Sequence, residues 1–271
     1  MIILHAEGQT CNRFFTYLNF IADSFETGEK IVILAPDVSF KDYPHLRNLN
    51  ILKFPFYSDI LVKLVGYDTY IKFLQKVLGN TYSLRFLLYL FKIFPSVRFI
   101  KAATGSYKSK KRFIHEIKLK QLFTPRFQIM SEVNSIFESK RTDFDLICGV
   151  HLRYGDYRIW LHGKYCYTEE QYHELMLNIK RLFPGRSIAF FISSNEKIDL
   201  SLFTDCNCFI ITNSTPTKDL YGLSISDYII GPPSTFSGWA SYYGNTPLNF
   251  IENPNKEIEL SSFKHISEIW N

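Results

Sequence analysis

One apolar run near the middle of the chain constrains the fold more than any other feature. Residues 146–152 read Leu-Ile-Cys-Gly-Val-His-Leu and are apolar apart from His151. A short continuous apolar run of this kind is typical of a parallel strand that is buried on both faces. Because parallel strands are joined by long crossovers that are usually helices, the run predicts an α/β fold.

The residues after this run continue an alternation of helix and strand. Thr168 and Gln171 form a capping box that begins a helix, and Pro184 and Gly185 end it. The apolar face of this helix consists of Tyr172, Leu175, Met176, Ile179 and Leu182. Further strands are predicted at 188–192, 208–212, 228–230 and 248–251, and a further helix from Ser234 or Thr235 to Tyr243.

The first part of the chain shows the same alternation. Residues 2–4 and 30–35 are predicted strands, and a helix that Gly28 ends lies between them. The apolar face of that helix consists of Phe14, Leu18, Ile21 and Phe25. Apolar residues at helical spacing predict two more helices between residues 60 and 100.

The length and the repeated alternation together predict two domains. A chain of 271 residues is long enough for two domains of ordinary size, and 46% hydrophobic residues suffice for a core in each. We therefore expect two Rossmann-like α/β domains that face each other across a central cleft. Their predicted bounds are residues 1–135 and 136–271.

Charge and cysteine content narrow the classes of partner. A formal net charge of +5 suits an anionic small molecule or a lipid head group, and the chain lacks the motifs of nucleic-acid-binding proteins. The five cysteines form no metal-ligand pattern, and their odd number argues against a full disulfide framework. They are typical of a reduced, cytoplasmic enzyme.

One stretch comes close to a membrane segment. Leu84 to Ile100 is apolar, but charged residues and Pro95 interrupt it, so it is too broken to span a bilayer. The basic residues at 108–112 follow it, and together they suit peripheral contact with the inner face of a membrane. The alternative is a buried helix followed by a solvated loop. The N-terminus begins with a predicted strand and shows no signal-peptide features, which favours the cytoplasm.

The strongest candidate for chemistry is the segment 151–157, His-Leu-Arg-Tyr-Gly-Asp-Tyr. It lies at the carboxyl end of the predicted central strand, where open α/β sheets bind ligands. Strand alternation places His151 and Arg153 on one side, and Gly155 permits a turn that returns Asp156 to them. An imidazole, a cation and a carboxylate are thus expected together. The alternative is a weak surface ion pair between Arg153 and Asp156.

Residues 227–239 form a second candidate. They run from a short strand through a Pro-Pro turn into a helix start that is rich in hydroxyl groups. N–H groups at a helix start bind phosphate, and Ser234, Thr235 and Ser237 would assist them. Ordinary N-capping by Ser234 is the alternative.

Two loops after predicted strands are further candidates. Residues 7–13, Glu-Gly-Gln-Thr-Cys-Asn-Arg, follow the first strand, but they do not form the G-x-G-x-x-G dinucleotide fingerprint. Residues 193–196, Ser-Ser-Asn-Glu, follow the strand at 188–192 and lie in the right place to contact a nucleotide. The alternative is that both are simple connections.

These four segments, in this order, resemble the bacterial α-1,2-fucosyltransferase family and, more loosely, the wider group that contains α-1,6- and protein O-fucosyltransferases. The hallmark His-x-Arg-Arg-Gly-Asp-Tyr is similar to residues 151–157. A first-loop Gly-x-x-x-Asn-[Gln/Arg] element is similar to residues 8–13, and a late Ser-x-Phe-Ser-x-Trp element to residues 234–239. Residues 193–195 look like the Ser/Thr-Asp/Asn segment of the family.

The resemblance implies a GT-B-like fold and an inverting transfer of L-fucose from GDP-fucose to a glycan hydroxyl, with no metal and no cofactor. By motif position, Arg153 binds the diphosphate, and its fixed guanidinium suits two phosphate oxygens at once. His151, Asp156 and Glu7 are the candidates for the base, and the sequence leaves this choice open. The implied nucleotide-binding residues are Asn12, Arg13, His151, Arg153, Ser193, Ser194, Asn195, Asp227, Ser234, Thr235, Phe236 and Ser237.

Two departures from the family pattern bear on specificity. Tyr154 replaces the second arginine of the hallmark, and residues 9–11 replace a glycine-rich stretch. The leading interpretation is a fucosyltransferase of surface polysaccharide or oligosaccharide synthesis, with an acceptor that could be lipid-linked. The alternatives are a transferase of the same fold that uses another nucleotide sugar, and a carbohydrate-binding protein without activity.

Overall fold

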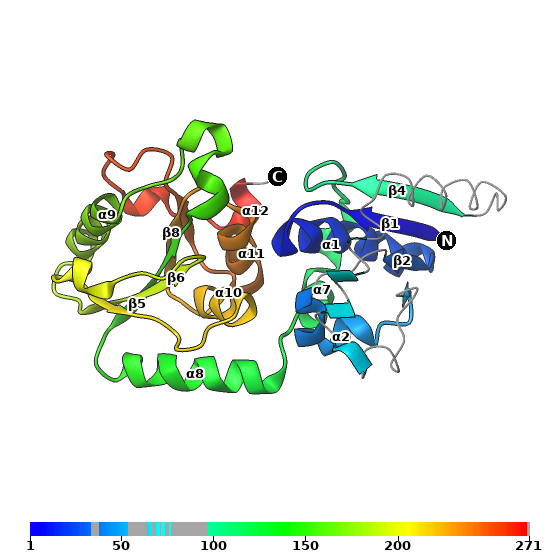
Figure 1. The fold of residues 1–271 in the computed structure, drawn as a ribbon, viewed down its shortest axis with the longest axis horizontal. Coiled ribbons are helices and arrows are strands. Elements are labelled where there is room, and N and C mark those ends of the chain that lie inside the picture. The colour runs from blue at the N-terminus through cyan, green and yellow to red at the C-terminus, as the bar shows by residue number, and fades with distance from the viewer. Residues whose placement is uncertain are drawn as a thin grey trace. The chain divides into compact units, whose positions relative to one another are not determined.

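The chain folds into two compact units, Met1–Arg126 and Phe127–Asn271. The computed structural model (Figure 1) describes residues 1–33, 38–53, 64–66, 69–70, 72–73, 76 and 97–269. The two units divide before the helix α8 (Phe127–Arg141), whereas the boundary predicted at residue 135 falls inside it. Each unit contains one parallel sheet.

The sheet of the second unit has five parallel strands in the order β7-β6-β5-β8-β9. Their bounds are β5 (Leu146–Leu152), β6 (Ile188–Ser194), β7 (Asn207–Phe209), β8 (Tyr228–Gly231) and β9 (Leu248–Phe250). The central strand thus coincides with the apolar run that predicted it. The prediction of a strand at 208–212 was wrong in extent, because only Asn207–Phe209 pairs with β6, and Ile211 lies beneath the helix that follows instead.

Helices cover both faces of this sheet (Figure 1). The helix α9 (Glu169–Leu182) packs on one face, while α8 and α10 (Pro216–Ser224) contact β5 from the other and α11 (Thr235–Gly244) contacts β8 and β9. The shorter elements of this unit are η2 (Gly155–Arg158), η3 (Trp160–Gly163), η4 (Leu200–Phe203), η5 (Leu260–Ser262) and α12 (Ile266–Ile269).

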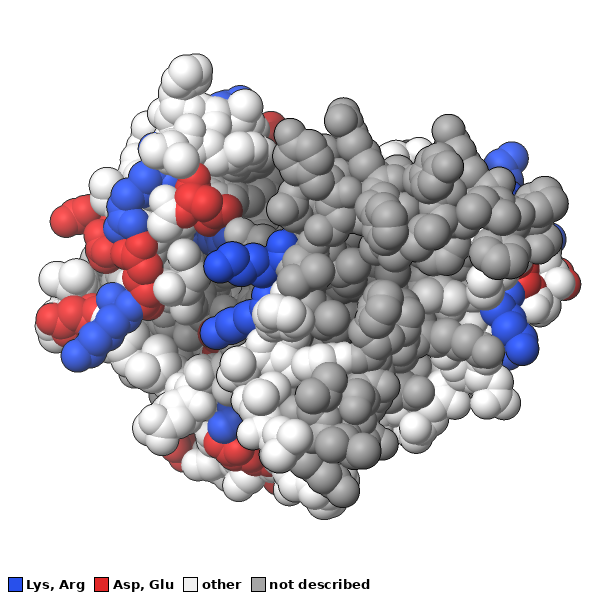
Figure 2. Space-filling model, turned by 45° about the vertical axis from the view of Figure 1, so that its right-hand side comes forward, with Lys and Arg blue, Asp and Glu red and all other residues white. Residues whose placement is uncertain are grey.

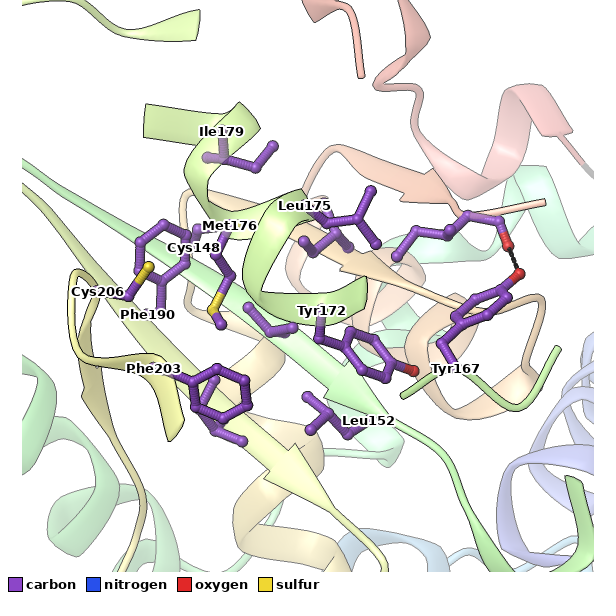
Figure 3. Close-up of a cluster of buried hydrophobic side chains, with 14 of the residues drawn as sticks. Cys148, Leu152, Tyr167, Tyr172, Leu175, Met176, Ile179, Phe190, Phe203 and Cys206 are labelled. Atoms are coloured by element: carbon purple, nitrogen blue, oxygen red, sulfur yellow. Dashed lines mark hydrogen bonds between the residues drawn. The ribbon is translucent and has the colours of Figure 1, made fainter. Parts of the chain in front are cut away.

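The helix α9 supplies the apolar core on its face of the sheet. Figure 3 shows Met176 of this helix on the side of Phe190, and Tyr172 on the side of Tyr167, within one buried cluster. The predicted capping box is confirmed, since Thr168 accepts from the Gln171 N–H and the Gln171 side chain accepts from the Thr168 N–H. The helix is thus both capped and buried along its apolar stripe.

Glycine allows the close approach of α10 on the opposite face. A Cβ atom on Gly222 would lie 2.6 Å from the ring of Phe191 in β6. Phe191 also contacts Phe137 of α8, with ring centroids 5.2 Å apart. The sequence interpretation missed this helix, although Thr215 before Pro216 is a recognisable start signal and does accept from the Lys218 N–H.

The first unit has a smaller parallel sheet, in the order β3-β2-β1-β4. Its strands are β1 (Ile2–Ala6), β2 (Ile31–Ile33), β3 (Leu52–Lys53) and β4 (Arg98–Ala102), and its helices are α1 (Thr10–Thr27), η1 (Val38–Asp42), α2 (Pro44–Arg47), α6 (Lys111–Ile114) and α7 (Glu116–Leu122). Gly28 ends α1 with a φ of 67°, in the left-handed region that glycine favours. Phe14 of α1 lies in an aromatic core with Phe40, Tyr43 and Phe123.

The prediction of helices up to residue 100 was wrong at its end. Residues 98–100 belong to β4, which pairs with β1 along its whole length, because sheet pairing outweighs a local helical spacing. Most of the stretch 60–97, including residues 84–96 of the proposed membrane-facing segment, lies outside the described residues. No helix within the described part of the chain is long and apolar enough to cross a membrane. Figure 2 shows acidic and basic side chains intermingled on part of the surface.

The capping box generates a prediction about stability. Thr168→Ala removes the hydroxyl that satisfies the Gln171 N–H, so the free energy of unfolding should fall by about 1 kcal/mol in urea denaturation. Thr168→Ser keeps the hydroxyl and should stay within about 0.5 kcal/mol of the original protein. Equal losses in the two variants would contradict the capping role.

Candidate functional site

The order of strands in the second unit reverses at one place. The chain passes from β5 to β6 and β7 on one side, whereas β8 and β9 join β5 on the other side. Connections from β5 and β8 therefore leave in opposite directions, and a ligand site is expected outside the carboxyl ends of these two strands. The candidate segment 151–157 begins at the end of β5, and the candidate segment 227–239 runs through β8 and passes its carboxyl end at Gly231.

His151 lies near the carboxyl end of β5, at this reversal of the strand order. It neighbours Gly231 of β8, where a Cβ atom would come within 2.9 Å of the His151 Cβ. The imidazole contacts the ring of Phe236, with centroids 5.1 Å apart. Glycine at 231 thus permits the close packing that brings β5 against the start of α11.

Burial determines the charge state of His151. Its side chain is 2% exposed, and burial followed by the nearby Arg153 charge lowers the pKa of the imidazole to about 3. His151 is therefore neutral at any physiological pH. Its Nδ1 atom is buried and has no hydrogen-bond partner among the described residues, which leaves a polar atom for a ligand.

Arg153 presents a largely buried cation beside this imidazole. Its side chain is 14% exposed, its Nη2 lies 2.8 Å from Oδ1 of Asp156, and its guanidinium lies 5.4 Å from the ring centroid of Tyr157. Gly155 has a φ of 58°, so the predicted turn that returns Asp156 to Arg153 is confirmed. The ion pair between Arg153 and Asp156, predicted as the alternative to a ligand site, is present. It is not a surface pair, because the Arg153 side chain is mostly buried.

The start of α11 lies against the same turn. Tyr157 donates a hydrogen bond to the Pro233 carbonyl at 2.6 Å. Ser234 caps the helix by accepting from the Phe236 N–H at 3.1 Å, and Ser237 donates to the Ser234 carbonyl at 3.3 Å. Thr235 is the first residue of the helix. The positive end of the helix dipole therefore lies next to Arg153 and His151, an arrangement that suits an anion.

The predicted loop 193–195 supports this turn from the side of β6. Asn195 accepts from the Tyr154 N–H at 2.9 Å, and Ser194 accepts from the Glu196 N–H at 3.1 Å. Ser193 donates to Asp219 of α10 at 3.3 Å. Asn195 therefore holds the turn, and the contact of these three residues with a nucleotide stays a prediction.

Sequence reasoning missed several residues that hold the turn in place. Glu196 accepts from the Gly155 N–H at 3.0 Å and forms a two-point pair with Arg158, while the Tyr172 hydroxyl lies between the His151 carbonyl and the Arg153 N–H. Asp219 carries a carboxyl whose pKa burial raises to about 6. The paired residues are 19 to 41 positions apart in the chain, so no local pattern could have revealed them.

Tyr154, which departs from the family pattern, belongs to the core. Its ring is buried in the cluster beneath α9 and lies edge-on to Tyr172, with centroids 6.5 Å apart. Alternation along the chain directs residue 154 away from the face of His151. A large apolar ring fills this space, where a charged side chain would have to be desolvated.

The prediction that Asp227 contacts the nucleotide was wrong in its placement. Asp227 precedes β8 and lies at the amino ends of the strands, where its carboxylate accepts from the Ile147 N–H at 2.7 Å and pairs with Arg141 at 2.9 Å. His151 and Arg153 lie at the opposite, carboxyl edge of the sheet. Asp227 therefore joins α8 to β5 and has a structural role.

The predicted residues of the first unit gather at the carboxyl end of β1. Gly8 has a φ of 87°, and Arg13 donates from Nε to its carbonyl at 2.8 Å. Asn12 accepts from the Thr104 hydroxyl at 2.8 Å, and Glu7 pairs with Lys101 of β4 at 2.7 Å. Because β2 and β4 flank β1, this edge is the strand-order switch point of the first sheet.

Metal ligands are not grouped in the described part of the chain. Within residues 1–33, 38–53 and 97–269 and the few described between them, no three His, Cys, Asp or Glu side chains form a group that could hold an ion. None of the five cysteines, all of which lie in the described residues, forms a disulfide.

Comparison with solved structures places the whole chain in a known fold. Three similar structures are POFUT1 with GDP (13% identity, TM-score 0.57, 92% of this chain and 98% of the other), POFUT1 with GDP-fucose (12%, 0.59, 90% and 95%) and the fucosyltransferase NodZ from Bradyrhizobium (14%, 0.54, 94% and 96%). The fold is the GT-B type of fucosyltransferases. No family model matches the sequence, and no curated protein matches it.

The comparison confirms the predicted fold class. The similar structures include fucosyltransferases outside the α-1,2 family that the motifs resemble. NodZ in its complex with GDP is described as an α-1,6-fucosyltransferase, so the structural likeness extends to enzymes of a different linkage from the α-1,2 family that the motifs resemble. A likeness at 10–14% identity establishes the fold. The donor, the linkage and the acceptor must therefore be argued from the site.

The charge state of His151 generates a prediction. With a pKa lowered to about 3, the ring should not titrate between pH 5 and 8, and its Cε1 chemical shift should stay constant in a ¹³C NMR titration. His151→Gln identifies the resonance. In the unfolded chain the imidazole takes up this proton near the ordinary histidine pKa of about 6.5, so His151 should reduce stability as the pH falls below that value. A titration midpoint within that range would contradict the burial argument.

Proposed function

We propose that this protein is an inverting fucosyltransferase that transfers L-fucose from GDP-fucose to a glycan hydroxyl. The observation that carries the proposal is the buried Arg153 guanidinium beside the start of α11, at the switch point of the second sheet. Structures of the same fold contain GDP and GDP-fucose, which supports this donor class. The α-1,2 linkage rests on the motif resemblance.

Arg153 is the proposed diphosphate ligand. A guanidinium can meet two phosphate oxygens at once and stays charged at any working pH. Its low exposure strengthens its attraction for charge, since water screens it less. Asp156 holds the guanidinium at 2.8 Å before the nucleotide arrives, so the cation is oriented in advance.

The start of α11 and His151 complete the proposed nucleotide site. The N–H groups of Thr235 and Ser237 in the first turn add donors to the phosphate end. His151 is neutral, so it contributes the Nδ1 hydrogen-bonding atom without a second positive charge, and Phe236 contributes an aromatic face for the guanine. Asn12 and Arg13 are assigned to the same donor by motif resemblance.

The chemistry needs charge stabilisation at the leaving group. Cleavage of the bond between fucose and the β-phosphate leaves negative charge on the phosphate as the sugar becomes oxocarbenium-like. Arg153 and the helix dipole act on that charge, as preorganised donors do in other transferases and hydrolases. Catalysis without a metal is part of the proposal.

Glu7 is the proposed base for the acceptor hydroxyl. Inversion requires the acceptor to approach the face of the sugar opposite the phosphate, so the base must lie away from the diphosphate ligand. Asp156 is paired with Arg153 and therefore belongs to the phosphate side, and an imidazole whose pKa is about 3 accepts protons poorly at neutral pH. Glu7, which pairs with Lys101 in the first unit, is the remaining candidate.

The biological setting follows from the chemistry and the resemblance together. A nucleotide-sugar donor is made in the cytoplasm, and the expected partners are the donor and a glycan acceptor, in surface polysaccharide or oligosaccharide synthesis. Contact of the segment 84–112 with a membrane and a lipid-linked acceptor remain proposals that rest on its apolar and basic residues.

The donor is tested by thermal stabilisation with GDP, UDP, CDP and GDP-fucose, each with and without EDTA. GDP and GDP-fucose should raise Tm, by several degrees at 100 times Kd, with no change in EDTA, because a ligand that binds only the folded state stabilises it by about 2.7 kcal/mol. UDP selectivity would favour another donor. No response to any nucleotide would favour a carbohydrate-binding protein.

Arg153→Ala should weaken GDP binding by about 100-fold or more, because it removes a charge-assisted contact to the diphosphate. Calorimetric titration with GDP measures the effect, and circular dichroism checks that the fold is retained. Arg186→Ala is the matched control, since Arg186 is a surface arginine paired with Asp145 at 3.7 Å. Equal GDP affinity in the two variants would overturn the assignment.

The base is tested by two isosteric variants. Glu7→Gln keeps the size of the side chain and removes the proton acceptor, so kcat should fall by about 100-fold or more while the KM for GDP-fucose stays unchanged. Asp156→Asn should mainly raise the KM for GDP-fucose, since it loosens Arg153. The reverse pattern would assign the base to Asp156.

A further inference from the structure

A strongly exposed apolar segment follows directly on the proposed nucleotide site. Ile159, Trp160 and Leu161 are 82%, 42% and 54% exposed. We call residues 159–162 the apolar loop. It continues from the turn that holds Arg153, as η2 runs into η3. Three adjacent large apolar side chains at a surface point to a binding role.

The backbone of the apolar loop is strained. Leu161 and His162 have φ angles of 48° and 57°, in the left-handed region that residues with a Cβ rarely adopt. Hydrogen bonds from the His162 N–H to the Ile159 carbonyl and from the Lys164 N–H to the Leu161 carbonyl, both at 3.2 Å, hold this shape. Strain that is not offset by burial of the side chains is typical of ligand-binding loops.

Aromatic rings connect the apolar loop to Arg153. The guanidinium of Arg153 lies 5.4 Å from the Tyr157 ring, the Tyr157 ring lies 4.8 Å from that of Trp160, and Trp160 lies 5.6 Å from Tyr165. Two contacts therefore separate Trp160 from the proposed diphosphate ligand. A sugar that reacts with a donor held by Arg153 has to lie within this short range.

We infer that Trp160, with Tyr165 beside it, forms a binding platform for the acceptor glycan. The inference rests on the proposed function and names the acceptor side of the same site. A pyranose ring has an apolar face of C–H groups that packs on aromatic rings and a rim of hydroxyls that needs polar partners. Trp160 supplies the apolar surface, and the exposed His162 is the polar side chain beside it in the chain.

The neighbouring charges favour a glycan over a membrane surface. Binding to a membrane by a short apolar loop needs a second contribution, usually free basic side chains. Arg158 is held in a two-point pair by Glu196, and Lys164 lies over the ring of Tyr165 at 4.9 Å. The basic residues on either side of the apolar loop are thus engaged within the protein.

Fluorine NMR of the full chain labelled with 5-fluorotryptophan tests the platform directly. The chain contains three tryptophans, and Trp160→Phe identifies the relevant resonance. After saturation with GDP, lactose, N-acetyllactosamine and chitotriose are titrated separately. At least one of these should shift the Trp160 resonance, whereas that of the fully buried Trp239 should stay constant.

A second measurement uses kinetics with the sugar that gives the largest shift. Trp160→Ala should raise the acceptor KM about tenfold and leave the KM for GDP-fucose unchanged, because stacking of this kind is worth about 1.4 kcal/mol. Trp160→Phe keeps an aromatic ring and should recover part of the loss. Leu202→Ala is the control, since Leu202 is as exposed as Leu161 but lies on η4.

Three results would overturn the inference. These are a constant Trp160 resonance with every oligosaccharide, an unchanged acceptor KM in Trp160→Ala, and a shift that only vesicles containing phosphatidylglycerol produce, which would indicate a membrane contact. The titrations are repeated without GDP. A protein that responds to the sugars but not to GDP would refute the proposed function and retain the platform as a glycan site.

Discussion

The burial of β5 on both faces is the constraint on which the second unit depends. The helix α9 covers one face and α8 and α10 cover the other, so the strand has no solvated side along Leu146–Leu152. Polar groups can reach a ligand only where the strand ends. The same end lies beside β8, where the strand order reverses, so one packing requirement places the imidazole, the guanidinium and the helix start together.

The turn at this end is held from several directions. Tyr172 contacts it from the α9 side, Asn195 and Glu196 from the loop after β6, and Tyr157 ties it to Pro233 before α11. Each contact satisfies a backbone group, so the turn has few alternative conformations. A cation fixed in this way meets a diphosphate without reorganisation, which is the physical basis for transition-state stabilisation in the proposed reaction. The strained apolar loop continues outward from the same rigid base.

The predictions that were wrong concern residues whose structure depends on a partner far away in the sequence. Residues 98–100 have helical spacing, yet they pair with β1 from the other end of the unit. Asp227 lies next to an apparent ligand segment in the chain, but the four-residue strand β8 carries it to the opposite edge of the sheet. Local pattern contains no information about such partners, because each belongs to another element.

The sequence by itself determined the parallel α/β architecture, the central strand, the capped helix at Thr168 and the motif that ends in Asp156. These follow from apolar periodicity, capping chemistry and the conformational freedom of Gly155, all of which act within a few residues. Only the tertiary structure decided that His151 is neutral, that Tyr154 belongs to the core, and that Trp160 is exposed in a row of rings beside Arg153. Burial and ring contacts depend on which elements meet in space, and spacing along the chain does not specify this.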